Sequence, residues 1–261
     1  MTIPARAGRS AALLFLAAAL VLAPGCARNR DKARDTAYIA RDAETLYTLA
    51  RTTLDQRNYK TAAGLFDEVE RQHPYSIWAR RAQLMSAFSH YAAQDYSAAI
   101  LSAQRFLSLH PGNRDAPYAH YIIAMSYYEQ IADVHRDQRV TQQAKDAMNE
   151  LVRRFPNSPY AADARLKLDL IDDHLAGKEM EIGRFYARNR QWIAASIRFR
   201  RVVDSYQTTS HVPEALYRLV EAYLALGIPE EAMRSAAVLG ANFPGSKWYE
   251  RGYRLMQQHA G

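Results

Sequence analysis

Residues 59–74 read YKTAAGLFDEVERQHP, and residues 96–111 read YSAAILSAQRFLSLHP. In both stretches Ala stands three residues after the first position, a large apolar residue stands ten residues after it, and His-Pro closes the stretch. Positions 3, 7, 10 and 14 residues after the start lie on one face of a helix with about 3.6 residues per turn. Proline lacks an N–H group and disfavours helical geometry in the residue before it. Each stretch therefore predicts one helix that stops just before its proline.

The same register recurs three more times, in frames that begin at Thr141, Trp192 and Pro229. The residue three places after the start is Ala in all five frames, namely Ala62, Ala99, Ala144, Ala195 and Ala232. Four frames end in proline, while the frame that begins at Trp192 reaches Gln207 instead. The recurring alanine predicts the point where two helices approach most closely, because a larger side chain would push them apart.

A second apolar-periodic stretch precedes each of these five helices, so the repeating unit is a helix, a turn and a helix. The first helices are expected at 43–56, 78–93, 115–131, 159–187 and 213–226, and a last helix is expected at 246–259. Successive units close 37, 45, 51 and 37 residues apart, which resembles the tetratricopeptide repeat with its basic period of about 34. The sequence predicts an all-α fold: a right-handed α-solenoid of five tetratricopeptide-like helix pairs plus a C-terminal helix. A generic helical bundle is the alternative.

Two segments depart from the simple repeat. The third unit carries an inserted loop at 132–139, with the sequence ADVHRDQR. The fourth unit has an unusually long first helix, in which Gly177 is expected to break or bend the helix. No alternation with a period of two predicts a strand.

The N-terminus has the pattern of an export signal. Arg6 and Arg9 precede a wholly apolar stretch at 11–23, which is too short to span a bilayer. The only cysteine of the chain, Cys26, follows at the expected cleavage point, so the segment resembles a bacterial lipoprotein signal. We therefore predict a signal peptide at 1–25, acylation of Cys26 and a charged tether at 26–40. An ordinary export signal with an incidental cysteine is the alternative.

Composition excludes several classes of protein. A hydrophobic fraction of 49% and a charged fraction of 23% are typical of a folded, water-soluble body, and one cysteine excludes a disulfide framework. A formal charge of +7 permits nucleic acid, anionic lipid or acidic protein partners. The basic cluster at 188–201 is interpreted first as solvated helix faces and next as a protein-docking surface. Nucleic acid comes last, because an exported chain does not meet it in the cytosol.

No pattern in the chain predicts catalysis. His73 and His110 occupy the repeat position that holds Phe155, Tyr206 and Phe243 in the other frames, which favours a packing role. The phosphate-binding, zinc-protease and nucleophile-elbow motifs are absent from the sequence. We therefore expect no enzyme activity, no cofactor and no metal site.

The signal, the repeats and three longer stretches together carry a family resemblance. The stretches are RFLSLHP at 105–111, RFPNSPYAADARLKLDLIDDHLAGKEMEIGRFY at 154–186 and YQTTSHVPEAL at 206–216. They resemble the BamD family, lipoproteins of the outer-membrane β-barrel assembly machinery, in its alphaproteobacterial branch. The resemblance implies a non-catalytic, lipid-anchored scaffold that faces the periplasm from the outer membrane. An envelope scaffold that coordinates peptidoglycan or cell-division factors is the alternative function.

The resemblance also implies partners and sites. Residues 41–131 would receive unfolded outer-membrane proteins, and residues 132–261 would dock the POTRA domains of the barrel-forming BamA-type subunit, with accessory lipoproteins nearby. The candidate client groove comprises Tyr47, Arg51, Tyr59, Arg80, Gln83 and Phe88. The candidate POTRA-docking residues are Arg198, Arg200 and Arg201.

Overall fold

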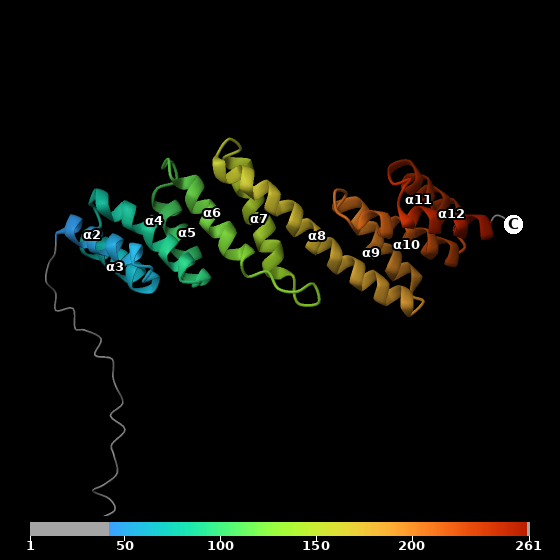
Figure 1. Ribbon diagram of the computed structural model, residues 1–261, viewed down its shortest axis with the longest axis horizontal. Coiled ribbons are helices and arrows are strands. Elements are labelled where there is room, and N and C mark those ends of the chain that lie inside the picture. The colour runs from blue at the N-terminus through green and yellow to red at the C-terminus, as the bar shows by residue number, and fades with distance from the viewer. Residues whose placement is uncertain (1–41, 260–261) are drawn as a thin grey trace, which may run out of the picture. The chain divides into compact units, whose positions relative to one another are not determined.

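A computed structural model describes residues 42–259, and within that range the chain forms helices and connecting loops with no strand (Figure 1). The helices are α2 (Ala43–Asp55), α3 (Tyr59–Gln72), α4 (Ile77–Ala92), α5 (Tyr96–Leu109), α6 (Ala116–Tyr128), α7 (Arg139–Arg154), α8 (Pro159–Arg188), α9 (Trp192–Ser205), α10 (Val212–Ala225), α11 (Pro229–Asn242) and α12 (Lys247–His259). The five predicted helix pairs and the C-terminal helix are confirmed. The predicted signal peptide, the acylation site Cys26 and the tether lie outside the described residues.

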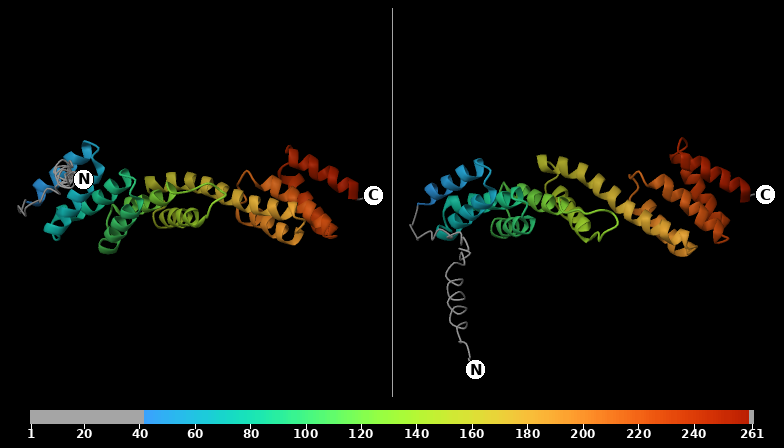
Figure 2. Two further views of the ribbon diagram at one scale, coloured as in Figure 1. Left: turned by 90° about the horizontal axis from the view of Figure 1, so that it is seen from below. Right: turned by 60° about the horizontal axis from the view of Figure 1, so that its bottom comes forward.

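Successive helices pack against each other in chain order, as Figures 1 and 2 show. The first helices of neighbouring pairs also touch, as in the contacts of α2 with α4, of α4 with α6 and of α6 with α8. Such stacking makes each pair cover the apolar face of the next, which no pair could bury alone. The chain therefore has the predicted architecture of a helical repeat.

The predicted alanine register is confirmed. Ala62, Ala99, Ala144, Ala195 and Ala232 are all fully buried. The residues seven places further along are buried equally well: Val69, Phe106, Leu151, Val202 and Leu239. The two sets lie on one helix face about two turns apart, so each second helix presents the same buried stripe to its neighbours.

The second helices all end with the same backbone geometry. The residues that cap them are His73, His110, Phe155, Tyr206 and Phe243, with φ between −132° and −136° and ψ between 47° and 57°. Each of these side chains is partly buried, and the ring of His110 packs edge-on against Phe106 at 5.4 Å. Tyr206 ends α9 without a following proline. A partly buried ring therefore caps each second helix, including α9, which has no proline after its cap.

The turns within four pairs share a residue in the left-handed region of backbone space. Arg57, Gln94, Arg190 and Gly227 have φ of 61°, 61°, 56° and 73°, and each stands two residues before the second helix of its pair. Only glycine adopts this conformation without a steric cost from Cβ. In the third pair the inserted loop replaces this turn, and α7 begins at Arg139, the last residue of the predicted insertion.

The predicted break of the long helix at Gly177 was wrong, because α8 runs continuously from Pro159 to Arg188 over 30 residues. A bend there stays a prediction. Gly177 is buried, and a Cβ there would lie 3.3 Å from Nε2 of His211. The absence of a side chain at Gly177 therefore allows the loop before α10 to approach the helix. This close packing offsets the low helix propensity of glycine. Ile171 belongs to the apolar cluster shared with α6 and α7, whereas Met180 belongs to the cluster shared with α9 and α10.

Candidate functional site

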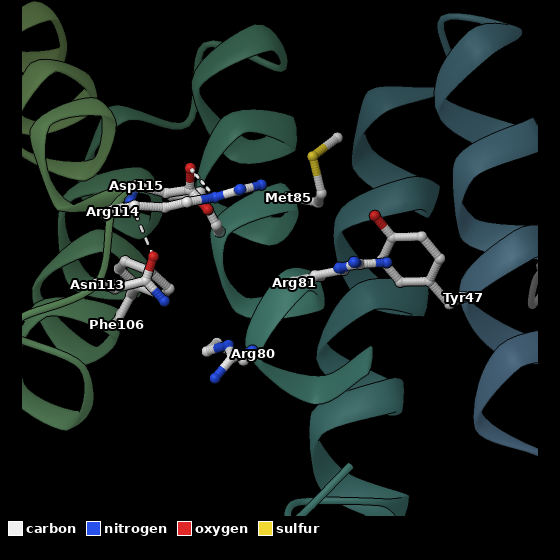
Figure 3. A pocket seen from close by; sticks show the side chains of 9 residues that line it. Tyr47, Arg80, Arg81, Met85, Phe106, Asn113, Arg114 and Asp115 are labelled. Atoms are coloured by element: carbon white, nitrogen blue, oxygen red, sulfur yellow. Dashed lines mark hydrogen bonds and ion pairs between the residues drawn. The ribbon is translucent and has the colours of Figure 1, made fainter. Parts of the chain in front are cut away.

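A hollow of about 680 Å³ opens between the first two helix pairs (Figure 3). Its lining comes from α2, α4, α5 and the loop before α6: Tyr47, Arg80, Arg81, Leu84, Met85, Phe106, Asn113, Arg114 and Asp115. A space of this size is within the range of pockets that hold small ligands or a few side chains of a peptide. We refer to it as the basic pocket.

Positive charge dominates the basic pocket. Three of its lining residues are arginines, and its one acid, Asp115, already faces Arg114 with an Oδ1–Nε distance of 3.7 Å. Arg80 is exposed and pairs with no carboxylate among residues 42–259. The guanidinium of Arg81 stacks over the ring of Trp78 at 5.3 Å. Guanidinium groups bind carboxylates through paired hydrogen bonds, so this pocket is suited to an anionic group.

Aromatic side chains form the other wall. The ring of Tyr47 lies 4.9 Å from that of Trp78 and 5.5 Å from that of Phe66, which holds Tyr47 in place at the edge of the pocket. Tyrosine offers a large apolar area with one polar group at low entropy cost. The pocket therefore combines charge for an anion with rings for apolar side chains.

A strip of tyrosines lies on the first helices of the next pairs. Tyr91 comes from α4, Tyr118 and Tyr121 from α6, and Tyr160 from α8. The ring of Tyr160 lies 5.3 Å from that of Tyr118 and 5.1 Å from that of Tyr121. Leu84 lines the basic pocket and also packs against the apolar cluster that Tyr91 and Tyr118 cover, so the strip continues from the pocket.

Three tyrosines of the strip, Tyr91, Tyr118 and Tyr121, are uncharged at neutral pH. Burial raises the pKa of Tyr118 and that of Tyr91 to about 12. Burial, together with the hydrogen bond that its hydroxyl donates to Asp163 at 2.8 Å, also raises the pKa of Tyr121. These three tyrosines can therefore hydrogen-bond and stack without adding charge to the surface.

The structure brings only two of the six predicted groove residues, Tyr47 and Arg80, into the basic pocket. Arg51 is exposed on α2, and Tyr59 packs against the apolar cluster of the first pair. Gln83 is buried and donates a hydrogen bond to Glu70 at 2.8 Å. Phe88 packs against the clusters on both sides of α4.

Sequence reasoning missed the other two arginines of the lining, Arg81 and Arg114. Arg81 directly follows the predicted Arg80, so the pair of basic residues was a usable signal. Arg114 lies in the loop before α6, and no sequence pattern places that loop beside α4.

The three predicted docking arginines make bonds within the chain. Arg198 and Arg201, on α9, share the carboxylate of Glu179 on α8, at 3.1 Å and 2.9 Å. Arg200 donates a hydrogen bond to the hydroxyl of Tyr223 on α10. The bond to Glu179 raises the pKa of Arg201, and the bond to Tyr223 raises the pKa of Arg200. These arginines connect neighbouring helices in the fourth and fifth pairs.

A second ion-pair group joins α8 to α10. Arg184 donates to both carboxylate oxygens of Glu214, at 3.0 Å and 2.7 Å, and Arg218 lies 3.5 Å from the same carboxylate. Burial opposes the charge on Glu214, but the hydrogen bonds and positive charges of Arg184 and Arg218 together outweigh burial and hold the pKa of Glu214 below its ordinary value. A bidentate arginine–carboxylate pair of this kind fixes the geometry between two helices.

Two searches of the described residues gave negative results. In residues 42–259 no three His, Cys, Asp or Glu side chains converge as a metal-binding group. None of the helices α2 to α12 is long and apolar enough to cross a membrane.

The repeat fold and the basic, tyrosine-rich surface define a class, the helical-repeat scaffold that binds other polypeptides. A model of the YfiO family, described as outer membrane lipoprotein, matches residues 39–239. A protein of Caulobacter vibrioides named outer membrane protein assembly factor BamD is 52% identical over 94% of this chain and 80% of its own length. Proteins of the same name from Rickettsia prowazekii (46% identical, 90% of this chain and 92% of theirs) and Neisseria meningitidis (34%, 89% and 92%) are also similar. The chain belongs to this family of outer membrane lipoproteins, and the predicted resemblance to its alphaproteobacterial branch is confirmed.

Proposed function

We propose that this protein is a non-catalytic scaffold of the outer-membrane β-barrel assembly machinery. In this role the protein is anchored to the outer membrane through acylated Cys26 and faces the periplasm. The basic pocket carries the proposal, because it offers unpaired guanidinium groups beside aromatic rings on the first helices of a repeat array. The names of the similar proteins support an assembly role.

The N-terminal repeats, residues 41–131, receive unfolded outer-membrane proteins in this proposal. A carboxylate at the end or within an extended client segment pairs with Arg80 and Arg81, and apolar side chains lie against Tyr47 and along the tyrosine strip. The helices fix the backbone of the pocket before binding, so binding must order side chains but no loop of α4. Of the residues predicted for this groove, Tyr47 and Arg80 contact the client, while Gln83 and Phe88 support the helices that present them.

The C-terminal repeats, residues 132–261, dock the POTRA domains of the barrel-forming subunit, and accessory lipoproteins join the complex. The ion pairs of Arg184 with Glu214 and of Arg198 with Glu179 keep α8, α9 and α10 in register, which gives the docking partner a rigid surface. The scaffold then holds a client at one part of the array and the assembly subunit at another.

The test of client binding uses the purified, lipidated full chain in detergent and an unfolded barrel protein of the same organism. Arg80→Glu combined with Arg81→Glu should weaken crosslinking at least tenfold by charge reversal. Arg139→Glu is the matched control, because Arg139 is exposed at the start of α7, away from the pocket. Equal crosslinking by the double variant and the control would refute the assignment of the pocket.

The role in the cell is tested separately by depletion. Loss of the protein should lower the amount of folded barrels in the outer membrane, and normal barrel levels would refute the proposed function. Recovery of cell-wall enzymes without any barrel-assembly subunit, in a pulldown from detergent-solubilised membranes, would instead favour the alternative role in peptidoglycan or cell-division scaffolding.

A further inference from the structure

The apolar core of the array changes over in the middle of α8, the long helix at the centre of Figure 1. Leu175 belongs to the cluster shared with α6 and α7, whereas the next residue, Ala176, belongs to the cluster shared with α9 and α10. The close stacking of first helix on first helix also ends here, because α8 contacts α6 but no comparable backbone contact joins α8 to α10 among the described helices. Residues 42–175, the N-terminal half, and residues 176–259, the C-terminal half, are therefore joined mainly by the continuous helix.

Tyr206, which caps α9, packs against both apolar clusters. The ammonium group of Lys145 on α7 lies 5.0 Å from the centre of this ring and 2.7 Å from the carboxylate of Asp172 on α8. Through this contact a cation of the N-terminal half touches a ring of the C-terminal half. One ring and one cation are little beside the apolar area that is buried inside either half.

Two polar contacts cross the same point of α8 in opposite directions. Asp173, in the N-terminal half, accepts hydrogen bonds from the backbone N–H and the hydroxyl of Ser210, at 3.1 Å and 2.8 Å, and so holds the loop before α10. Lys178, in the C-terminal half, donates a hydrogen bond to the carbonyl oxygen of His135 at 3.1 Å and so holds the inserted loop of the third unit. Each half of α8 therefore holds a loop that belongs to the other half.

Both loops approach the same turn of α8. A Cβ at Gly177 would lie 3.3 Å from Nε2 of His211, next to the loop before α10, and 3.6 Å from Cγ1 of Val134 in the inserted loop. A hollow of about 250 Å³ remains between α8 and these two side chains, so the turn is not tightly packed. Glycine also has the lowest helix propensity after proline. The turn around Gly177 is therefore the part of α8 that bends most easily.

We infer that the array bends at one joint, the turn of α8 between Asp173 and Lys178, and that the two loops form a clasp that holds this joint straight. Because each loop is carried by one half and held by the other, bending of α8 between the two residues strains both contacts at once. The side chain of Asp173 is 44% exposed, and hydrogen bonds and ion pairs of exposed charges are weak, so the clasp can open.

The joint gives a role to the insertion at 132–139, which the basic repeat lacks. It goes beyond the proposed function and does not depend on it. Within that function, bending at the joint changes the angle between the basic pocket and the C-terminal repeats, which is the kind of hinge motion that a few residues of one element can absorb.

The first test measures distances between paired spin labels in the purified, lipidated full chain in detergent. Leu101→Cys on α5 and Val238→Cys on α11 place labels at exposed positions on either side of the joint. Leu49→Cys on α2, paired with Leu101→Cys, places both labels in the N-terminal half. A count of two labels per chain checks that Cys26 has not reacted.

Opening the clasp should change only the distances across the joint. Asp173→Ala combined with Lys178→Ala should shift and widen the distance distribution between α5 and α11 and leave that between α2 and α5 as it is. Glu231→Ala is the matched control, because it removes an ion pair within α11. An unchanged distribution across the joint in the double variant would overturn the inference. Equal widening in the control, or within the N-terminal half, would also overturn it, because the flexibility would then be spread over the array.

Hydrogen exchange tests whether the two contacts act together. Asp173→Ala should speed exchange in the inserted loop, and Lys178→Ala should speed exchange at residues 207–211, each by about two- to fivefold, the factor that loss of an exposed ionic contact allows. Neither substitution removes a hydrogen bond of the loop in which the change is expected, so the effect requires one bend that strains both contacts. If each substitution alters only the loop that its own side chain held, the two loops are independent and the inference fails.

Discussion

The arginines of the second helix pair and those of the fourth pair are in opposite situations. Arg80 and Arg81 line an open pocket, where one has no carboxylate partner among residues 42–259 and the other stacks on Trp78. Arg184, Arg198 and Arg201 each bond to a carboxylate that is 12% or 13% exposed, on Glu179 or Glu214. The same residue type therefore offers charge to a ligand in one region and joins helices in the other. What decides between the two roles is the presence of a carboxylate on the neighbouring helix.

The largest effect is expected where an arginine partner is removed. Glu214→Gln should lower the free energy of unfolding by about 2–3 kcal/mol, because it removes the bidentate partner of Arg184 and a partner of Arg218, and leaves Arg184 paired with Glu181 alone. Arg80→Ala should change it by no more than about 0.5 kcal/mol, since nothing in the fold depends on that charge. Chemical denaturation of both variants measures the contrast. Equal losses would show that the two regions use arginine in the same way.

Low pH should remove the contribution of Glu214 to the stability of the folded protein. Its pKa in the folded protein lies below the ordinary value of 4.5, so its stabilisation is fully present above about pH 4.5 and is lost as pH falls through the lowered pKa. The difference in Tm between the wild-type protein and Glu214→Gln should therefore shrink as pH falls below 4.5, the ordinary value for this carboxyl group. A difference that stays constant as pH falls would contradict the ionised pair.

Overpacking of the buried alanine should destabilise the two regions by similar amounts, even though their arginines have different roles. Ala99→Leu in the second pair and Ala195→Leu in the fourth should each destabilise the fold by about 1–3 kcal/mol, because both alanines are fully buried. Ser97→Leu is the control, since Ser97 is exposed on the same helix as Ala99. Thermal melting gives the comparison, and an unmoved Tm for Ala99→Leu or Ala195→Leu would refute the shared register.

The smallest effect concerns the turns that both regions share. Arg57→Gly and Gln94→Gly should each stabilise the protein by about 0.5–1 kcal/mol, because glycine relieves the left-handed conformation at φ 61°. Gly227→Ala, at φ 73° in the fifth pair, should destabilise it by about 1 kcal/mol for the converse reason. A gain from Gly227→Ala would mean that this turn relaxes to another backbone conformation.

Local patterns predicted the helices well and the surfaces poorly. Short-range patterns predicted the five alanines, the helix stops and the insertion in the third unit. Helix periodicity and proline both affect the backbone only within a few residues, so their effects are visible in the sequence. The break predicted at Gly177 was wrong for a related reason. Its low propensity is a local property, whereas the approach of His211, which favours glycine there, joins residues 34 positions apart.

The candidate sites required pairings that span helices. Tyr47 and Arg80 were predicted together and do meet in the basic pocket, but Arg114 reaches it from a loop whose position follows only from the stacking of α6 on α4. The predicted docking arginines were identified by their basic, aromatic setting. The carboxylate that engages two of them, Glu179, lies 19 and 22 residues earlier in the chain.

The amino-acid sequence by itself determined the repeat, its register, the helix ends and the family, because each depends on residue types at fixed short spacings. The tertiary structure alone decided which arginines are free, which hollows exist and which aliphatic residues stay in water. Those properties depend on distances between side chains of different helices, and such distances exist only once the pairs have stacked. The sequence thus shows which residues share a helix face, whereas only the packed structure shows which side chains of other helices that face contacts.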